Sequence, residues 1–229
     1  MAIRKNNVLG QTSGKLGNTV TRIRNGKEVV YALPDKVKVS NSKQAKAARN
    51  KFALTVGFAK FINSIQALSS VWNNANIPGT NSFQKLIKQN LKLTGENYLT
   101  LKNIITPAGF DISLEKFSLL NDSASFSLRL SENISLELRS SNFHVHAVIY
   151  FHEPRLKKDK PFVFSHLSVD DQVVVPNTTV DIRLELNTIQ QNLFLNYKQS
   201  VIYMAVLTHS DGTNNPVWSN TVSAQINLP

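Results

Sequence analysis

Basic side chains gathered near the N-terminus are the residues of this chain whose type and spacing best suit binding. Residues 1–60 carry thirteen Lys and Arg against two acidic residues, whereas the remaining chain carries thirteen of each sign. The formal net charge of +11 therefore belongs to this segment. Such a cluster binds anions, either nucleic-acid phosphates or the carboxylates of an acidic protein surface. The candidate partner-binding residues are Lys15, Arg22, Arg24, Lys27, Lys43, Lys46 and Arg49.

Histidines are the second group with possible chemistry. His144 and His146 alternate along one predicted strand and His152 has the same parity, so the three imidazoles point to one face. Two such side chains can share a metal ion, but no carboxylate is clearly placed to complete a site. We favour the alternative that the histidines lie on the solvent face of the strand, and we predict no metal or other cofactor. The core face then consists of Val145, Ala147, Ile149 and Phe151.

No motif for catalysis stands out. Asp170-Asp171 precedes an apolar run without the regular oxygen spacing of a calcium loop, so a turn is predicted there. The sequence has no nucleophile elbow and no ordered Ser-His-Asp set. Lys15 follows Gly14, but no strand precedes the pair and no Ser or Thr follows it, which excludes a P-loop. We expect a protein that is not an enzyme.

Composition narrows the class further. With no cysteine, the chain has no disulfide, no Cys-ligated zinc and no thiol nucleophile. A hydrophobic content of 41% over 229 residues supports a substantial core. No apolar run approaches the roughly 20 residues that span a bilayer, so no membrane partner is expected. The N-terminus shows no apolar segment typical of a Sec signal, which favours a virion or the cytoplasm.

The first 41 residues are predicted to form an extended basic arm with a β-hairpin. Residues 1–18 are rich in Gly, Asn and Ser and have little apolar content of their own. Alternating segments at 19–24 and 27–33 then flank Asn25-Gly26, which suits a type I′ turn. One face of the first strand carries Val20, Arg22 and Arg24, and the other carries Thr19, Thr21 and Ile23.

Residues 42–97 are predicted to be helical. Ser42 is the expected N-cap of a long helix over 43–73, and Gly57 inside it indicates close backbone contact. A second helix over 81–92 is expected after a Thr80 or Asn81 cap. Spacings of three and four residues define the apolar seam of the first helix, formed by Leu54, Phe58, Phe61, Ile65, Leu68 and Trp72. The residues expected to widen it are Phe52, Val56, Ala59 and Ile62.

From residue 98 the apolar period changes to two, which predicts strands. They are expected near 98–105, 112–120, 124–130, 134–139, 143–151, 162–168, 178–186, 201–208 and 217–227. Short strands at this spacing indicate an antiparallel sandwich over 98–229, of the immunoglobulin or fibronectin III type. The predicted fold class is therefore α+β, with a basic arm and hairpin, two helices and then the sandwich.

Through residues such as Ser13-Gly14-Lys15, Gly17-Asn18 and Arg49 to Ala53, the first sixty residues resemble an uncharacterised family of Bacteroidota and their phages. That family opens with a glycine-rich leader, continues through a Gln/Ala/Arg-Lys-Phe helix start and ends in an immunoglobulin-like half. The resemblance implies a Bacteroidota or phage origin and a non-enzymatic role. The matching residues are Leu9-Gly10, Ser13-Gly14-Lys15, Gly17-Asn18, Arg22, Gly26-Lys27, Val29-Val30, Pro34, Gln44-Ala45 and Arg49 to Ala53.

Three interpretations of the arm remain open. It docks on neighbouring protein subunits, it tracks the phosphates of nucleic acid without reading sequence, or it stays solvated. We favour docking within a phage particle or a similar assembly, because valines and Ile23 alternate with the basic residues and suit strand addition. The expected partners are thus copies of this chain or other protein subunits, with nucleic acid as the alternative.

Overall fold

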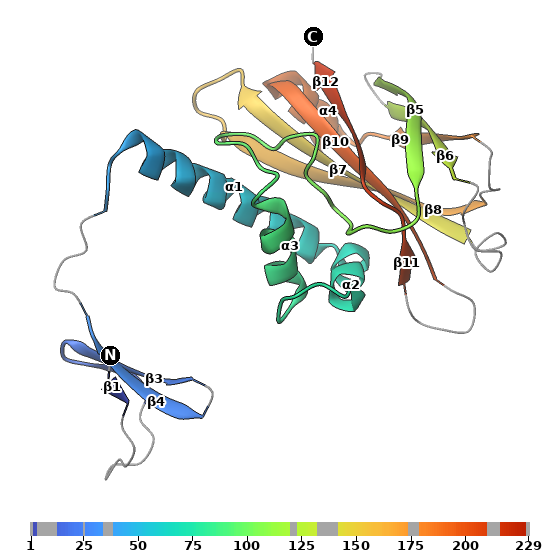
Figure 1. Cartoon of the computed structure of the whole chain (residues 1–229). Coiled ribbons are helices and arrows are strands. Elements are labelled where there is room, and N and C mark those ends of the chain that lie inside the picture. The colour runs from blue at the N-terminus through green and yellow to red at the C-terminus, as the bar shows by residue number, and fades with distance from the viewer. Residues whose placement is uncertain are drawn as a thin grey trace. The chain divides into compact units, whose positions relative to one another are not determined.

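The computed structural model describes residues 2–3, 13–24, 26–33, 39–119, 123–131, 142–173, 179–209 and 216–227. The chain divides into two compact units, Met1–Lys46 and Ala47–Pro229, and each is described by itself (Figure 1). The described residues form four helices and three antiparallel sheets. This confirms the predicted α+β class with antiparallel strands.

The N-terminal unit contains a four-stranded sheet in the order β1-β4-β3-β2. Its strands are β1 (Ala2–Ile3), β2 (Gly14–Leu16), β3 (Thr19–Arg24) and β4 (Lys27–Ala32). β3 and β4 pair from Thr19 opposite Ala32 to Arg24 opposite Lys27, which confirms the hairpin. Gly26 has a φ of 73°, the sign that a type I′ turn requires, whereas Asn25 lies outside the described residues.

Two helix starts follow the predicted caps. In α1 (Lys43–Ser64), the Ala45 N–H donates to the Ser42 hydroxyl oxygen at 3.2 Å. In α3 (Ser82–Asn90), the Gln84 N–H donates to the Asn81 side-chain oxygen at 2.9 Å. Each cap satisfies a backbone donor that the first helical turn leaves without an intrahelical acceptor.

The expected continuous helix over 43–73 is wrong. Ile65 adopts an extended conformation, with φ −89° and ψ 108°, and a separate helix α2 (Gln66–Asn74) begins after it. At the end of α1 the Ser64 hydroxyl donates to the Phe61 carbonyl oxygen at 2.6 Å. A serine that hydrogen-bonds the backbone in this way competes with helix continuation. The apolar spacing continues in phase across the break between α1 and α2, so the spacing alone could not predict that break.

The second unit, which we call the body, has three layers. Its middle layer is a five-stranded sheet, β11-β10-β7-β8 with β12 also paired to β10. A three-stranded sheet, β5-β6-β9, packs on one face and α1–α3 pack on the other (Figure 1). The strands are β5 (Ile112–Leu119), β6 (Ser123–Leu130), β7 (Asn142–Pro154), β8 (Phe162–Val173), β9 (Thr179–Glu185), β10 (Tyr197–His209), β11 (Pro216–Trp218) and β12 (Val222–Asn227).

Alternate residues of the central strands enter two different cores. Ile149 of β7 lies in the core between the sheets, together with Phe126 of β6 and Ile182 of β9. Val148 and Tyr150 of β7 point the other way, into the core beneath the helices. The face expected to meet solvent is therefore covered, and the prediction that the histidines there lie at a solvent face is wrong.

The helical seam is buried at four of its six predicted positions, Leu54, Phe58, Leu68 and Trp72. Phe61 and Ile65 are half-buried. Phe52 does not widen the seam, because it is 52% exposed. The close backbone contact predicted at Gly57 is not seen, because a Cβ there would lie 3.5 Å from the Phe162 ring of β8, an ordinary van der Waals distance to a side chain.

Residues 98–105 form a loop rather than the expected strand. Hydroxyl groups of the five-stranded sheet donate hydrogen bonds to two carbonyl oxygens of this loop. The Tyr203 hydroxyl donates to the Thr100 oxygen at 2.8 Å, and the Ser223 hydroxyl donates to the Leu101 oxygen at 2.7 Å. These bonds replace the ladder that a neighbouring strand would provide. The alternation of this segment therefore reflects Leu99 and Ile105 entering the helix-side core at separate points.

Other boundaries also differ from the prediction. A helix α4 (Thr188–Asn196) precedes β10, with a capping box between Asn187 and Gln190 that the sequence analysis missed. The expected strand 217–227 is divided into β11 and β12. Asp170-Asp171 lies within β8 and not in a turn. The strand expected at 134–139 lies outside the described residues.

Candidate functional site

Strand register gathers four of the predicted binding residues on one face of the N-terminal sheet. Lys15 is opposite Val20, and Val20 is opposite Tyr31. Arg24 is opposite Lys27 in the same hairpin. Directly paired residues share a face, and so do residues two apart along a strand. The cationic face therefore comprises Lys15, Val20, Arg22, Arg24, Lys27, Val29 and Tyr31.

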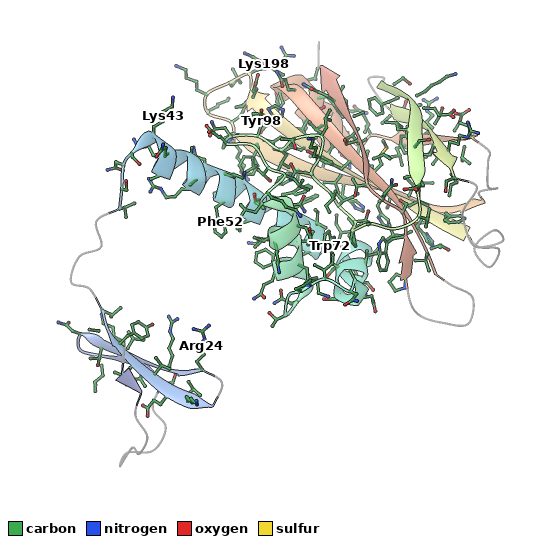
Figure 2. The ribbon with its side chains drawn as sticks, viewed as in Figure 1. Arg24, Lys43, Phe52, Trp72, Tyr98 and Lys198 are labelled. Atoms are coloured by element: carbon green, nitrogen blue, oxygen red, sulfur yellow. The ribbon has the colours of Figure 1, made fainter. Side chains whose placement is uncertain are left out.

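Electrostatics on the cationic face favour an anionic partner. All four of its cationic residues are exposed. Arg24 and Lys27 lie directly opposite one another, a like-charge pair that destabilises an isolated sheet. The described positions of this face hold no acidic residue. The Arg22 guanidinium lies 5.7 Å from the centre of the Tyr31 ring, which orients it by a cation–π contact. Figure 2 labels Arg24.

The opposite face of this sheet is largely apolar, with Glu28 as its one charged residue among the described positions. It contains Leu16, Thr19, Thr21, Ile23, Glu28, Val30 and Ala32. Leu16 is 81% exposed and Ile23 is 45% exposed. We call these residues the apolar face.

The described side chains of the N-terminal sheet form no apolar core. Among its side chains that the structure describes, Glu28 is buried and no apolar one is. A small sheet needs a buried hydrophobic face to be stable in water, and burial yields about 25 cal/mol per Å² of apolar surface. The sheet is therefore suited to gaining stability from a partner that covers it.

The other three predicted binding residues, Lys43, Lys46 and Arg49, lie on α1 and not on this sheet. All three are exposed. No acidic residue occupies the first turn of α1, where acidic residues usually offset the positive end of the helix dipole. The start of α1 is therefore also electropositive.

Two histidines of β7 contact a histidine and an aspartate of β8, on the face of the sheet that the helices cover. The Nδ1 atom of His146 lies 3.0 Å from Nε2 of His166, and the two rings stack. The Nδ1 atom of His144 lies 3.1 Å from an Asp170 carboxylate oxygen. His144, His146 and Asp170 line a cavity of about 200 Å³. The sequence analysis missed His166, and it considered Asp170 only as a calcium ligand and not as a partner of His144.

His152 does not join this group, and stacks instead on Tyr150 with ring centres 4.8 Å apart. Within the described residues, no group of three or more His, Cys, Asp or Glu side chains is arranged to hold a metal ion. In the structure, His144 and His146 contact polar side chains of β8, and His152 packs on a tyrosine ring.

Acidification should destabilise the body through these histidines. Burial, reinforced by the neighbouring His166, lowers the pKa of His146 from 6.5 to about 4, and burial lowers the pKa of His166 as well. The unfolded chain therefore binds protons that the folded chain excludes between these values. We expect the free energy of unfolding to fall by about 2–3 kcal/mol from pH 7 to pH 4, measured by urea denaturation.

The matched control is His146→Gln, whose amide keeps a hydrogen bond to His166 without titrating. This variant should flatten the pH dependence between pH 6.5 and 4. Asp170 and His144 face the same site, and Asp170 raises the pKa of His146 while His144 lowers it. An unchanged slope in His146→Gln would assign the pH dependence to other groups.

Comparison with known proteins identifies no family. No protein-family model matches the chain, and no curated protein sequence matches it significantly. Among solved structures, a DUF3823 family protein from Bacteroides ovatus is 13% identical, with a TM-score of 0.31. That alignment covers 52% of this chain and 56% of the other.

Two further structures are similar at the same level. A protein from Arabidopsis thaliana is 12% identical over 53% of this chain and 80% of its own, with a TM-score of 0.28. A β-glucosidase from Kluyveromyces marxianus is 13% identical over 53% of this chain and 14% of its own, with a TM-score of 0.24. Scores this low carry no argument about function. In the described part of the chain, no helix combines the length and apolar character needed to cross a bilayer.

Proposed function

We propose that this protein is a non-enzymatic assembly protein whose N-terminal sheet docks on a neighbouring subunit of a multi-subunit particle. The observation that carries the proposal is the two-faced sheet, which is folded but buries no described apolar side chain. In this proposal the particle is that of a Bacteroidota phage, and the body is an immunoglobulin-like module attached by the sheet.

The two faces have complementary roles in docking. The apolar face supplies hydrophobic contact through Leu16 and Ile23, whose side chains are both exposed. The cationic face selects an acidic surface and speeds encounter with it. Residues beyond 60 are electrically balanced, so a second copy of the body offers no net negative charge. The charge pattern thus favours a different, acidic subunit.

Nucleic acid is the second candidate partner. The specific observation in its favour is that four exposed basic side chains share one face of the sheet. They are Lys15, Arg22, Arg24 and Lys27. Arg22 and Arg24 are two residues apart on a strand, about 6.8 Å along it, and such a row can neutralise successive phosphates. In that case the apolar face remains uncovered.

Matched double variants distinguish the two partners. Arg22→Glu with Arg24→Glu reverses charge on the cationic face, and Leu16→Ser with Ile23→Ser removes apolar groups from the other. Lys157→Glu with Lys158→Glu, two exposed lysines of the body, is the charge-reversal control. Each protein is tested for co-sedimentation with particles purified from the phage and for binding to a duplex DNA.

For docking on protein, we expect both arm variants to reduce co-sedimentation at least tenfold while the control does not. Duplex DNA should bind no more tightly than about 10⁻⁴ M at physiological salt. Sub-micromolar DNA binding that the charge reversal abolishes, with a salt slope near −0.9 per phosphate, would assign the arm to nucleic acid instead. Removing residues 1–40 should leave the body folding cooperatively, which keeps loss of docking separate from loss of folding.

A further inference from the structure

A groove of about 1020 Å³ lies in the body, beside the loop that contains residues 98–105. One wall is the 92–102 segment, and the other is formed by the end of β7 with parts of β10 and β12. Tyr98, which is 54% exposed, and the neighbouring Leu101 line it. Figure 2 labels Tyr98 and Lys198, which adjoins the groove residue Gln199 in β10.

The wall that carries Tyr98 is held rigidly against the sheet. Tyr203 and Ser223 donate hydrogen bonds to the carbonyl oxygens of Thr100 and Leu101. Two residues close to Tyr98 are thus held by side chains of the five-stranded sheet. A binding wall fixed before the ligand arrives loses little conformational entropy on binding.

Polar side chains line the opposite wall. Gln225 of β12 is paired with Val201 of β10, and Gln199 lies two residues before Val201, so both amides are on one side of the sheet. His152 is opposite Gln199 on β7. In the described residues, no hydrogen bond of the Gln199 or Gln225 side chain is seen within the chain. Amide groups are therefore presented together at the surface of the groove.

Glu153 adds a second, independent sign of a binding site. Its φ is 58°, and among the described residues other than glycine it alone has a positive φ. Such a conformation is strained for a residue with a Cβ, and strained residues concentrate at ligand-binding positions. The strain occurs where the carboxylate-bearing residue lines the groove, beside His152 and Pro154.

We propose that this groove binds a carbohydrate chain. Sugars present ring faces rich in C–H groups, against which an exposed aromatic ring such as that of Tyr98 packs. They also present adjacent hydroxyl groups, which the paired donors and acceptors of Gln199 and the carboxylate of Glu153 match. The groove is partly open to solvent and its volume of about 1020 Å³ has room for several sugar units. This binding goes beyond the docking role of the N-terminal sheet.

Charge at the groove limits the choice of sugar. Lys92 and Lys102 line one wall and Glu153 the other. A polyanion would meet the Glu153 carboxylate, whereas a neutral chain brings no like charge to it. The test therefore includes neutral and uronic-acid oligosaccharides as separate arms.

Binding is measured on the full-length protein by calorimetry, with oligosaccharides from neutral glucans, xylans and mannans and from polygalacturonate, and with a poly-glutamate peptide as a non-sugar anion. Isotope-labelled protein reports the location through the side-chain amide signals of Gln199 and Gln225. We expect at least one sugar class to bind and to shift these signals.

Tyr98→Ala should weaken that binding about tenfold or more, because it removes the aromatic surface. Phe52→Ala is the matched control, since Phe52 is 52% exposed and lies outside the groove. Gln199→Ala should also weaken binding and leave thermal unfolding unchanged. The proposal is overturned if no sugar shifts the amide signals at millimolar concentration, if Tyr98→Ala binds like the parent, or if only poly-glutamate binds.

Discussion

Replacing Trp72 by Ala should lower the free energy of unfolding of the body by about 3–5 kcal/mol. Trp72, which Figure 2 labels, belongs to α2, and its side chain is fully buried in the core beneath the helices. Its indole Nε1 donates a hydrogen bond to the Ile105 carbonyl oxygen at 2.8 Å. The substitution therefore leaves both a large cavity and a buried carbonyl without its donor.

Urea denaturation followed by circular dichroism measures this effect. Trp72→Phe keeps much of the volume and loses the hydrogen bond, so its effect should be smaller than that of Trp72→Ala. Phe52→Ala should change stability by no more than about 0.5 kcal/mol, because Phe52 is largely exposed. Equal effects of Trp72→Ala and Phe52→Ala would mean that the helix-side core contributes little to the fold.

Local signals were sufficient to predict several elements. Asn25-Gly26 between two alternating segments predicted the hairpin, because a two-residue type I′ turn fixes the register of both strands. The Ser42 cap and the seam through Leu54 and Phe58 predicted the start and the buried face of α1. In each case the deciding interactions lie within a few residues along the chain.

Long-range packing explains most of the errors. Ile65 interrupts the helix without interrupting the apolar spacing, so periodicity cannot detect the break. Both faces of β7 are buried, because helices cover the face that alternation assigned to solvent. Loop residues 98–105 are held by hydroxyl groups from strands a hundred or so residues later. No local pattern contains that information.

In the candidate site, too, local patterns were predictable and long-range pairing was not. Alternation along β3 predicted that Arg22 and Arg24 share a face, and the two-residue turn places Lys27 opposite Arg24. Adding Lys15 required the register of β2, which follows a segment without a clear pattern. Near the histidines, a register shift between Phe143 and Val145 prevents simple counting from identifying the β8 partners. The positive charge of the segment was thus predictable from the sequence. Which side chains share a face was predictable only within the hairpin.

Asn90→Leu should have the second large effect on stability. The Asn90 side chain is fully buried at the end of α3. Its oxygen accepts from the Ile104 N–H at 2.8 Å and from the Asn103 amide at 3.1 Å, and its amide donates to the Ile104 carbonyl oxygen at 3.0 Å. Leucine satisfies none of these groups. Since each buried group left without a partner costs about 1–3 kcal/mol, we expect a loss of about 2–5 kcal/mol.

The same substitution should loosen the segment that carries Tyr98. Asn103 also accepts from the Thr100 N–H at 2.8 Å and donates to the Thr94 hydroxyl oxygen at 2.9 Å, so Asn90 supports the groove wall through it. Hydrogen exchange should therefore accelerate at the amides of residues 99–104 in Asn90→Leu. Thr94→Ser, which keeps the hydroxyl, should change neither stability nor exchange appreciably. Loss of stability with unchanged exchange in this segment would show that the wall is held by the sheet hydroxyls alone.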